Sequence, residues 1–198
     1  MGKFFRKFRN IFDRYKIYSQ VTDLTSISRR YFVIGYFDGV LTIMGLIVGA
    51  HLSGVVSRNF IIGAGFATAL ALGISSGFGA YEAEIIEQSI RKREIERAML
   101  SEVGGIIESA HRVAIYFSTF VHAIAPLIGA IVPLTPYFIL PLDFAYYNAL
   151  TLGFASLFAV GFTFGKISKE NVILAGLKFV LAGLITLIVV MVLNPVRV

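Results

Sequence analysis

The chain has 198 residues, of which 57% are hydrophobic and only 15% are charged, and its mean hydropathy is +0.78. This composition excludes an ordinary water-soluble domain, in which about 25% of residues are charged, and a disordered chain, which needs low hydrophobicity. The sequence contains no cysteine, which excludes disulfides and thiolate metal sites, and its formal net charge is +6.

The first residues of the chain alternate aromatic and basic side chains. Phe4, Phe8, Ile11, Phe12 and Tyr15 recur at helical spacing within residues 1–16, with lysine and arginine between them. This pattern is typical of a helix that lies in the membrane interface and binds anionic lipid. A nucleic-acid-binding arm is the alternative, and the apolar stripe argues against it. We therefore expect a basic amphipathic segment over 1–30, followed by a membrane domain over 31–198.

Five long apolar runs follow, each long enough for a membrane-spanning helix of about 20 residues. They cover residues 31–52, 60–81, 113–132, 144–165 and 172–193. Alternation with a period of two is absent, which excludes the strands of a membrane barrel. The expected fold class is an all-α integral membrane protein with five transmembrane helices. Pro133, Pro136 and Pro141 predict a tight turn between the third and fourth helices.

Basic residues concentrate in 1–30, 82–112 and 166–170, and the positive-inside rule assigns these segments to the cytoplasm. The C-terminus is then expected outside the cell or in a lumen, and the membrane is a cell inner membrane or a vacuolar-type membrane. Segment 82–112 starts as a direct continuation of the second span. It predicts a cytoplasmic helical extension, with a break at Gly104–Gly105.

Ionisable residues lie inside several of the predicted spans, where a charged side chain costs about 2.5–3.5 kcal/mol on insertion scales. Asp38, in the first span, predicts a cation ligand or a proton carrier, and the alternative is a structural hydrogen bond or a helix cap. His122, in the third span, is either a metal or proton ligand or a hydrogen-bonding partner of a neighbouring helix. Lys178 is close enough to one end of the fifth span to extend its charge to the interface.

Carboxylates cluster at the mouth of the second span. Glu82, Glu84 and Glu87 follow that span, and Glu84 and Glu87 share a helix face. Such clusters attract divalent cations, although an exposed helix face with ion pairs such as Glu87 with Arg91 is the alternative. For Glu82 and Glu84 we favour cation binding. Asp143, at the start of the fourth span, is expected to cap that helix, and the alternative is that it receives an ion that leaves the membrane.

The sequence carries no catalytic signature and no cofactor motif. It lacks a Ser–His–Asp arrangement, a phosphate-binding loop and a His-Glu-x-x-His motif, so we predict that the protein is not an enzyme and has no bound cofactor. A carboxylic acid in a low dielectric favours its neutral form, and a divalent cation displaces its proton. The membrane carboxylates therefore predict exchange of a metal ion against protons.

Four short motifs occur in order between residues 30 and 193: DGVLT at 38–42, SSGFGAY at 75–81, GAIVPLTPY at 129–137 and GKIS at 165–168. In order and spacing they resemble the vacuolar iron transporter family. The resemblance implies a five-helix homodimer whose first and second helices line a path for divalent iron, which leaves the cytoplasm in exchange for protons. It also implies that segment 82–112 collects metal with its glutamates.

This chain departs from the family pattern at three positions. Ser76 and Ala80 stand where the family has methionine and an acidic residue, and Phe37 stands where asparagine is common. Without the soft methionine ligand, manganese(II) is expected as a cargo alongside iron(II). Two alternatives stay open, namely a transporter of another divalent cation such as magnesium or calcium, and a membrane scaffold that transports nothing.

Overall fold

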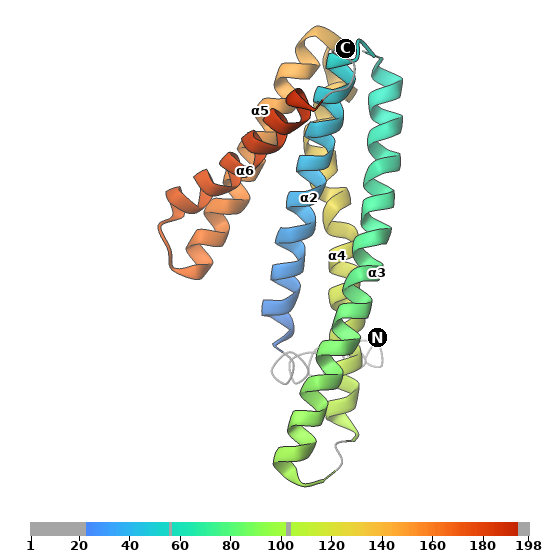
Figure 1. Cartoon of the computed structure of the whole chain (residues 1–198), viewed down its shortest axis with the longest axis vertical. Coiled ribbons are helices and arrows are strands. Elements are labelled where there is room, and N and C mark those ends of the chain that lie inside the picture. Colours follow the sequence, from blue (N-terminus) through green and yellow to red (C-terminus); the bar gives the residue numbers. More distant parts are fainter. Residues whose placement is uncertain (1–22, 56, 102–103, 194–198) are drawn as a thin grey trace, which may run out of the picture. The chain divides into compact units, whose positions relative to one another are not determined.

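The computed structural model describes residues 23–55, 57–101 and 104–193. Over these residues the chain forms helices α2 (Leu24–Leu52), α3 (Arg58–Met99), α4 (Ile106–Ile139), α5 (Leu142–Ser168) and α6 (Val172–Val192) (Figure 1). All five are long and apolar enough to span a membrane, which confirms the all-α class and the five predicted apolar helices. The interfacial helix expected at 1–16 lies outside the described residues.

Helix α3 is much longer than a membrane is thick. Its 42 residues extend about 63 Å at 1.5 Å per residue, whereas the hydrocarbon core of a bilayer is about 30 Å thick. The predicted continuation of the second span into segment 82–112 is therefore confirmed up to Met99. The predicted break at Gly104–Gly105 is also confirmed, because Gly105 has a φ of +69°, a conformation that glycine adopts without strain, immediately before α4.

The turn predicted at Pro133 and Pro136 is wrong. Helix α4 continues through both prolines, and the connection to α5 is made by residues 140–141. Each proline removes a backbone hydrogen bond, but Leu134 and Tyr137, in the same stretch, are each only 1% exposed. Burial of these large side chains offsets the lost hydrogen bonds. Only Pro141 lies at the connection, directly before α5.

The described residues form two compact units. The first contains residues 23–32 and 75–123, and the second contains residues 33–74 and 124–193, apart from the positions that the structure does not describe. Within the second unit, α2 packs against α4 with backbones in contact. A Cβ on Gly39 would overlap the carbonyl of Pro126, and one on Gly129 would overlap the carbonyl of Tyr36. Glycine therefore allows the closest possible approach of these two helices.

Helices α5 and α6 lie side by side as a hairpin in the second unit (Figure 1). Gly161 permits this packing, because a Cβ there would come within 2.7 Å of the Ala175 carbonyl oxygen. Asn171 caps α6 by accepting hydrogen bonds from two backbone N–H groups, at 3.1 and 3.3 Å. Asp143 does not cap α5 as predicted. The N-cap of α5 is Pro141, and Asp143 is the second residue of the helix, where a negative charge interacts favourably with the helix dipole.

Candidate functional site

The first unit has polar side chains in its interior. Among the described residues, the buried polar side chains all belong to this unit: Ser28, Glu84, Gln88, His111 and Ser118. The apolar clusters of buried residues lie in the second unit instead. Because burying a polar group costs free energy unless it is paired, this interior is poorly explained by packing alone and is the candidate functional site.

Glu84 is the charged member of this interior. It lies on α3 and is only 1% exposed. The Gln88 side chain, one turn further along α3, donates from Nε2 to Glu84 Oε2 at 2.9 Å. The Tyr31 hydroxyl, from α2, also hydrogen-bonds the carboxylate. Both partners are uncharged, so neither forms an ion pair with the carboxylate.

Arg30 is the cation nearest to this pair along α2. Its guanidinium carbon lies 5.6 Å from the centroid of the Tyr31 ring, and its side chain is exposed. A solvated guanidinium at this position contributes a screened positive field rather than a buried ion pair. The Glu84 carboxylate therefore contacts the Tyr31 hydroxyl, and the exposed Arg30 guanidinium lies over the Tyr31 ring.

Two histidines of α4 share one hydrogen-bonding arrangement. His111 Nδ1 lies 3.1 Å from the Gln88 backbone oxygen, and His122 Nδ1 lies 2.8 Å from the Tyr31 backbone oxygen. A carbonyl oxygen only accepts, so Nδ1 carries the hydrogen in each ring. In a neutral imidazole, Nε2 then keeps its lone pair, which is the orientation that metal-ligating histidines use. The hydrogen bond predicted as the alternative for His122 is thus confirmed.

Several buried polar atoms have no hydrogen-bond partner within the described chain: Gln88 Oε1, Ser28 Oγ, Ser118 Oγ and Thr119 Oγ1. All of them belong to the first unit. Buried polar atoms are nearly always paired in folded proteins, with protein, water or an ion. Gln88 Oε1 belongs to the amide that holds Glu84, and carboxylate and amide oxygens are ligands that hard cations prefer.

The structure separates the other glutamates of the predicted cluster from Glu84. Glu82 and Glu87 are exposed, and Glu87 pairs with Arg91 at 3.1 Å, as the alternative interpretation predicted. The described residues bring no three histidine, aspartate or glutamate side chains together as a metal site. The immediate polar neighbours of the Glu84 carboxylate are therefore Gln88 and Tyr31 and not other glutamates.

Asp38 belongs to the second unit. It is partly exposed on α2, between Tyr36 and Gly39, the two residues whose backbone contacts α4. This close contact fixes the helix segment that carries the carboxylate, because neither helix can shift without opening the interface. Asp38 lies within a helix of membrane-spanning length, as predicted, and its role as a cation ligand or proton carrier stays a prediction.

The sequence did not predict that His111, Ser118 or Tyr31 belong to the site. A signal was present in α4, since His111, Ser118 and His122 are spaced by seven and four residues and so share a helix face. Tyr31 gave no such signal, because tyrosine is common at the ends of membrane spans for interfacial reasons.

Together, the helices and their buried carboxylate define a multi-pass helical membrane protein with ionisable groups in its interior. The model of the VIT family matches residues 29–100 and 82–194, and the chain belongs to this family. The chain is also 35% identical over 159 residues to an uncharacterized protein of Methanocaldococcus jannaschii, a match that covers 78% of this chain and 82% of that protein. VIT family membership suggests divalent metal transport, and transporters of this family are generally not enzymes.

Proposed function

We propose that the chain exports iron(II) or manganese(II) from the cytoplasm in exchange for protons. The observation that supports this most directly is Glu84, a carboxylate that is 1% exposed and has uncharged hydrogen-bond partners. A proton and a divalent cation compete for the same carboxylate oxygens. In the proposed cycle this side chain holds a proton in one step and contributes to metal binding in another.

Asp38 supplies the second carboxylate of the proposed path, in a homodimer. Two copies of Asp38 near a two-fold axis carry two negative charges, which match the charge of one divalent cation. The described part of one chain gathers no three acidic or histidine side chains as a metal site, and in the proposed dimer a second copy would supply further ligands. The exposed Glu82 would raise the local cation concentration at the cytoplasmic entrance, whereas the charge of Glu87 is offset by its ion pair with Arg91.

The donor atoms favour a hard or borderline cargo. Glu84 and the unpaired amide oxygen of Gln88 are oxygen donors, and the soft methionine of the family is replaced by Ser76. Oxygen donors suit manganese and also magnesium or calcium. Transport of one of these other divalent cations is therefore the second candidate function.

The proposal is tested by flux in proteoliposomes that contain the full chain and a trapped pH indicator. An iron(II) or manganese(II) gradient should drive proton movement in the wild type, and Asp38→Ala or Glu84→Gln should abolish it. Glu87→Gln is the matched control, because Glu87 lies on the same helix but is exposed and ion-paired. Unchanged flux in Asp38→Ala and Glu84→Gln would reject the assigned roles.

Two further results would change the cargo or the function. If magnesium or calcium outcompetes manganese(II) in the same liposomes, the second candidate function replaces the first. If no divalent cation moves or binds in the wild type, the chain is a scaffold relative that does not transport.

A further inference from the structure

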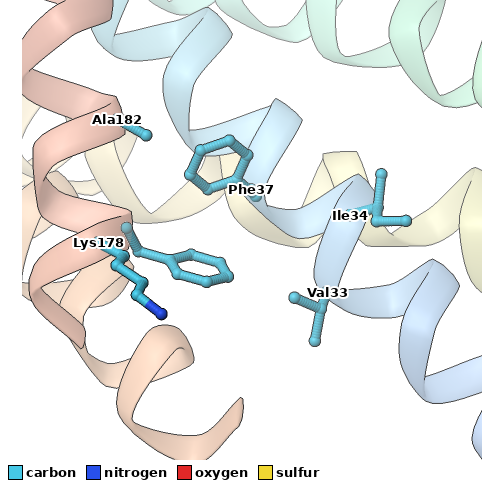
Figure 2. A pocket seen from close by; sticks show the side chains of 6 residues that line it. Val33, Ile34, Phe37, Lys178 and Ala182 are labelled. Carbon is cyan, nitrogen blue, oxygen red and sulfur yellow. The ribbon is translucent and has the colours of Figure 1, made fainter. Parts of the chain in front are cut away.

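An apolar groove of about 270 Å³ lies within the second unit, between α2 and α6 (Figure 2). Its lining residues are Val33, Ile34 and Phe37 from α2 and Lys178, Phe179 and Ala182 from α6. The Phe37 and Phe179 rings meet edge to face with centroids 5.2 Å apart, which holds the two helices together at the groove. Both helices have the length and composition of membrane spans, so a groove that opens on their surface opens into lipid.

Among the described residues that line the groove, Lys178 is the only charged one, and it lies at one end of the groove (Figure 2). It is six residues after the first residue of α6, about 9 Å along the helix axis. Its Nζ nevertheless lies 3.7 Å from Glu170 Oε2, in the turn between α5 and α6. The ammonium therefore lies close to the level of the helix end, where lipid headgroups lie, while its apolar stem follows the helix.

The groove continues from this cation towards the middle of the membrane. Ala182 is one helical turn deeper than Lys178 on α6, and its small side chain leaves space beside Phe179. A positive charge at the membrane surface followed by an apolar groove is complementary to an anionic phospholipid, whose negative phosphate lies at the interface above its acyl chains. The charge and the position in the bilayer thus point to one class of occupant.

We propose that the groove binds an acyl chain of an anionic phospholipid, whose phosphate contacts Lys178 in the leaflet next to the α5–α6 turn. Glu170 competes with the phosphate for the same ammonium. Because the side chains of Lys178 and Glu170 are 70% and 60% exposed, their ion pair is weak, and a lipid phosphate can displace the carboxylate or share the ammonium with it. The lipid site does not depend on the proposed metal transport.

The first test compares lipid affinities of the full, delipidated chain by native mass spectrometry. Phosphatidylglycerol should bind more tightly than phosphatidylcholine. Lys178→Gln should weaken phosphatidylglycerol binding about fivefold, the effect of one lysine near an anionic lipid surface, and should leave phosphatidylcholine unchanged. Lys178→Arg should retain the preference, and Lys166→Gln, which removes a cation from the last turn of α5 outside the groove, should have no effect.

Two other variants separate this proposal from a general folding defect. Glu170→Gln should strengthen phosphatidylglycerol binding, because it removes the competing carboxylate. Ala182→Phe should fill the groove and weaken both lipids, with the thermal midpoint and the oligomeric state unchanged. An unaltered lipid preference in Lys178→Gln, or the absence of a gain in Glu170→Gln, would refute the lipid site. A changed oligomeric state in Ala182→Phe would also refute it, since the groove would then be covered by a second copy.

Discussion

Gly39 and Gly49 allow a controlled test of how α2 is packed around Asp38. Both glycines lie in the same helix, and the same substitution, to alanine, adds the same methyl group at each. At Gly39 the new Cβ would overlap the Pro126 carbonyl on α4, whereas at Gly49 it would meet nothing within 4 Å. Any difference between the two variants therefore reports the contact with α4 and not the chemistry of the substitution.

The two variants should shift stability in opposite directions. Overpacking costs about 1–3 kcal/mol, and the obstacle at Gly39 is backbone, which cannot rotate away, so we expect Gly39→Ala to cost about 2 kcal/mol or more. Gly49→Ala should stabilise the protein by about 0.5–1 kcal/mol, because alanine loses less backbone entropy than glycine in a helix. For a chain of this size, 1 kcal/mol corresponds to roughly 2–4 °C in the thermal midpoint.

The assay is thermal denaturation of the purified chain in one detergent, followed by the loss of the helical circular dichroism signal. Gly39→Ala should lower the midpoint by roughly 4–8 °C, and Gly49→Ala should raise it by about 1–4 °C. Equal shifts of the same sign in the two variants would refute the close contact between α2 and α4. Since Gly39 follows Asp38 directly, Gly39→Ala should also reduce metal-driven proton flux, whereas Gly49→Ala should not.

The remaining predictions concern the core, an exposed ion pair and the polar interior. Leu157→Ala should cost about 2–5 kcal/mol in the same denaturation assay, because Leu157 is fully buried, and the half-exposed Leu184→Ala on α6 should cost much less. Arg91→Ala should change stability by less than about 1 kcal/mol, and only at low salt, because its pair with Glu87 is exposed. Gln88→Leu should destabilise the protein through the loss of the hydrogen bond to Glu84, whereas a stability equal to wild type would show that this bond contributes nothing.

The membrane spans could be predicted from the sequence because lipid imposes a simple local rule. A backbone in hydrocarbon must satisfy its own hydrogen bonds, so about 20 apolar residues in a row form a helix whatever its neighbours are. The end of α4 did not follow a local rule. Pro133 and Pro136 locally favour a turn, and the burial of Leu134 and Tyr137 against other helices decided the outcome.

The site could be predicted only where the signal lies in the type of a single residue. Asp38 is conspicuous because a carboxylate in a membrane span is costly wherever its neighbours lie. Glu84 and Glu87 are three positions apart and share a face in an ideal helix, yet one is 1% exposed and the other is paired with Arg91 at the surface. Their different exposure depends on which side of α3 is covered by α2 and α4. Helical periodicity alone does not give that information.

The contacts that define the polar interior are therefore the least accessible to sequence reasoning. The His122 side chain meets the Tyr31 carbonyl across 91 positions of the chain, and His111 meets the Gln88 carbonyl across 23. In both pairs one partner is a backbone oxygen, which every residue carries, so the hydrogen bond does not constrain the residue type of that partner. Only the histidine is visible in the sequence. In each histidine the fold satisfies one ring nitrogen with this backbone oxygen. What else the side chain binds therefore depends on its second ring nitrogen.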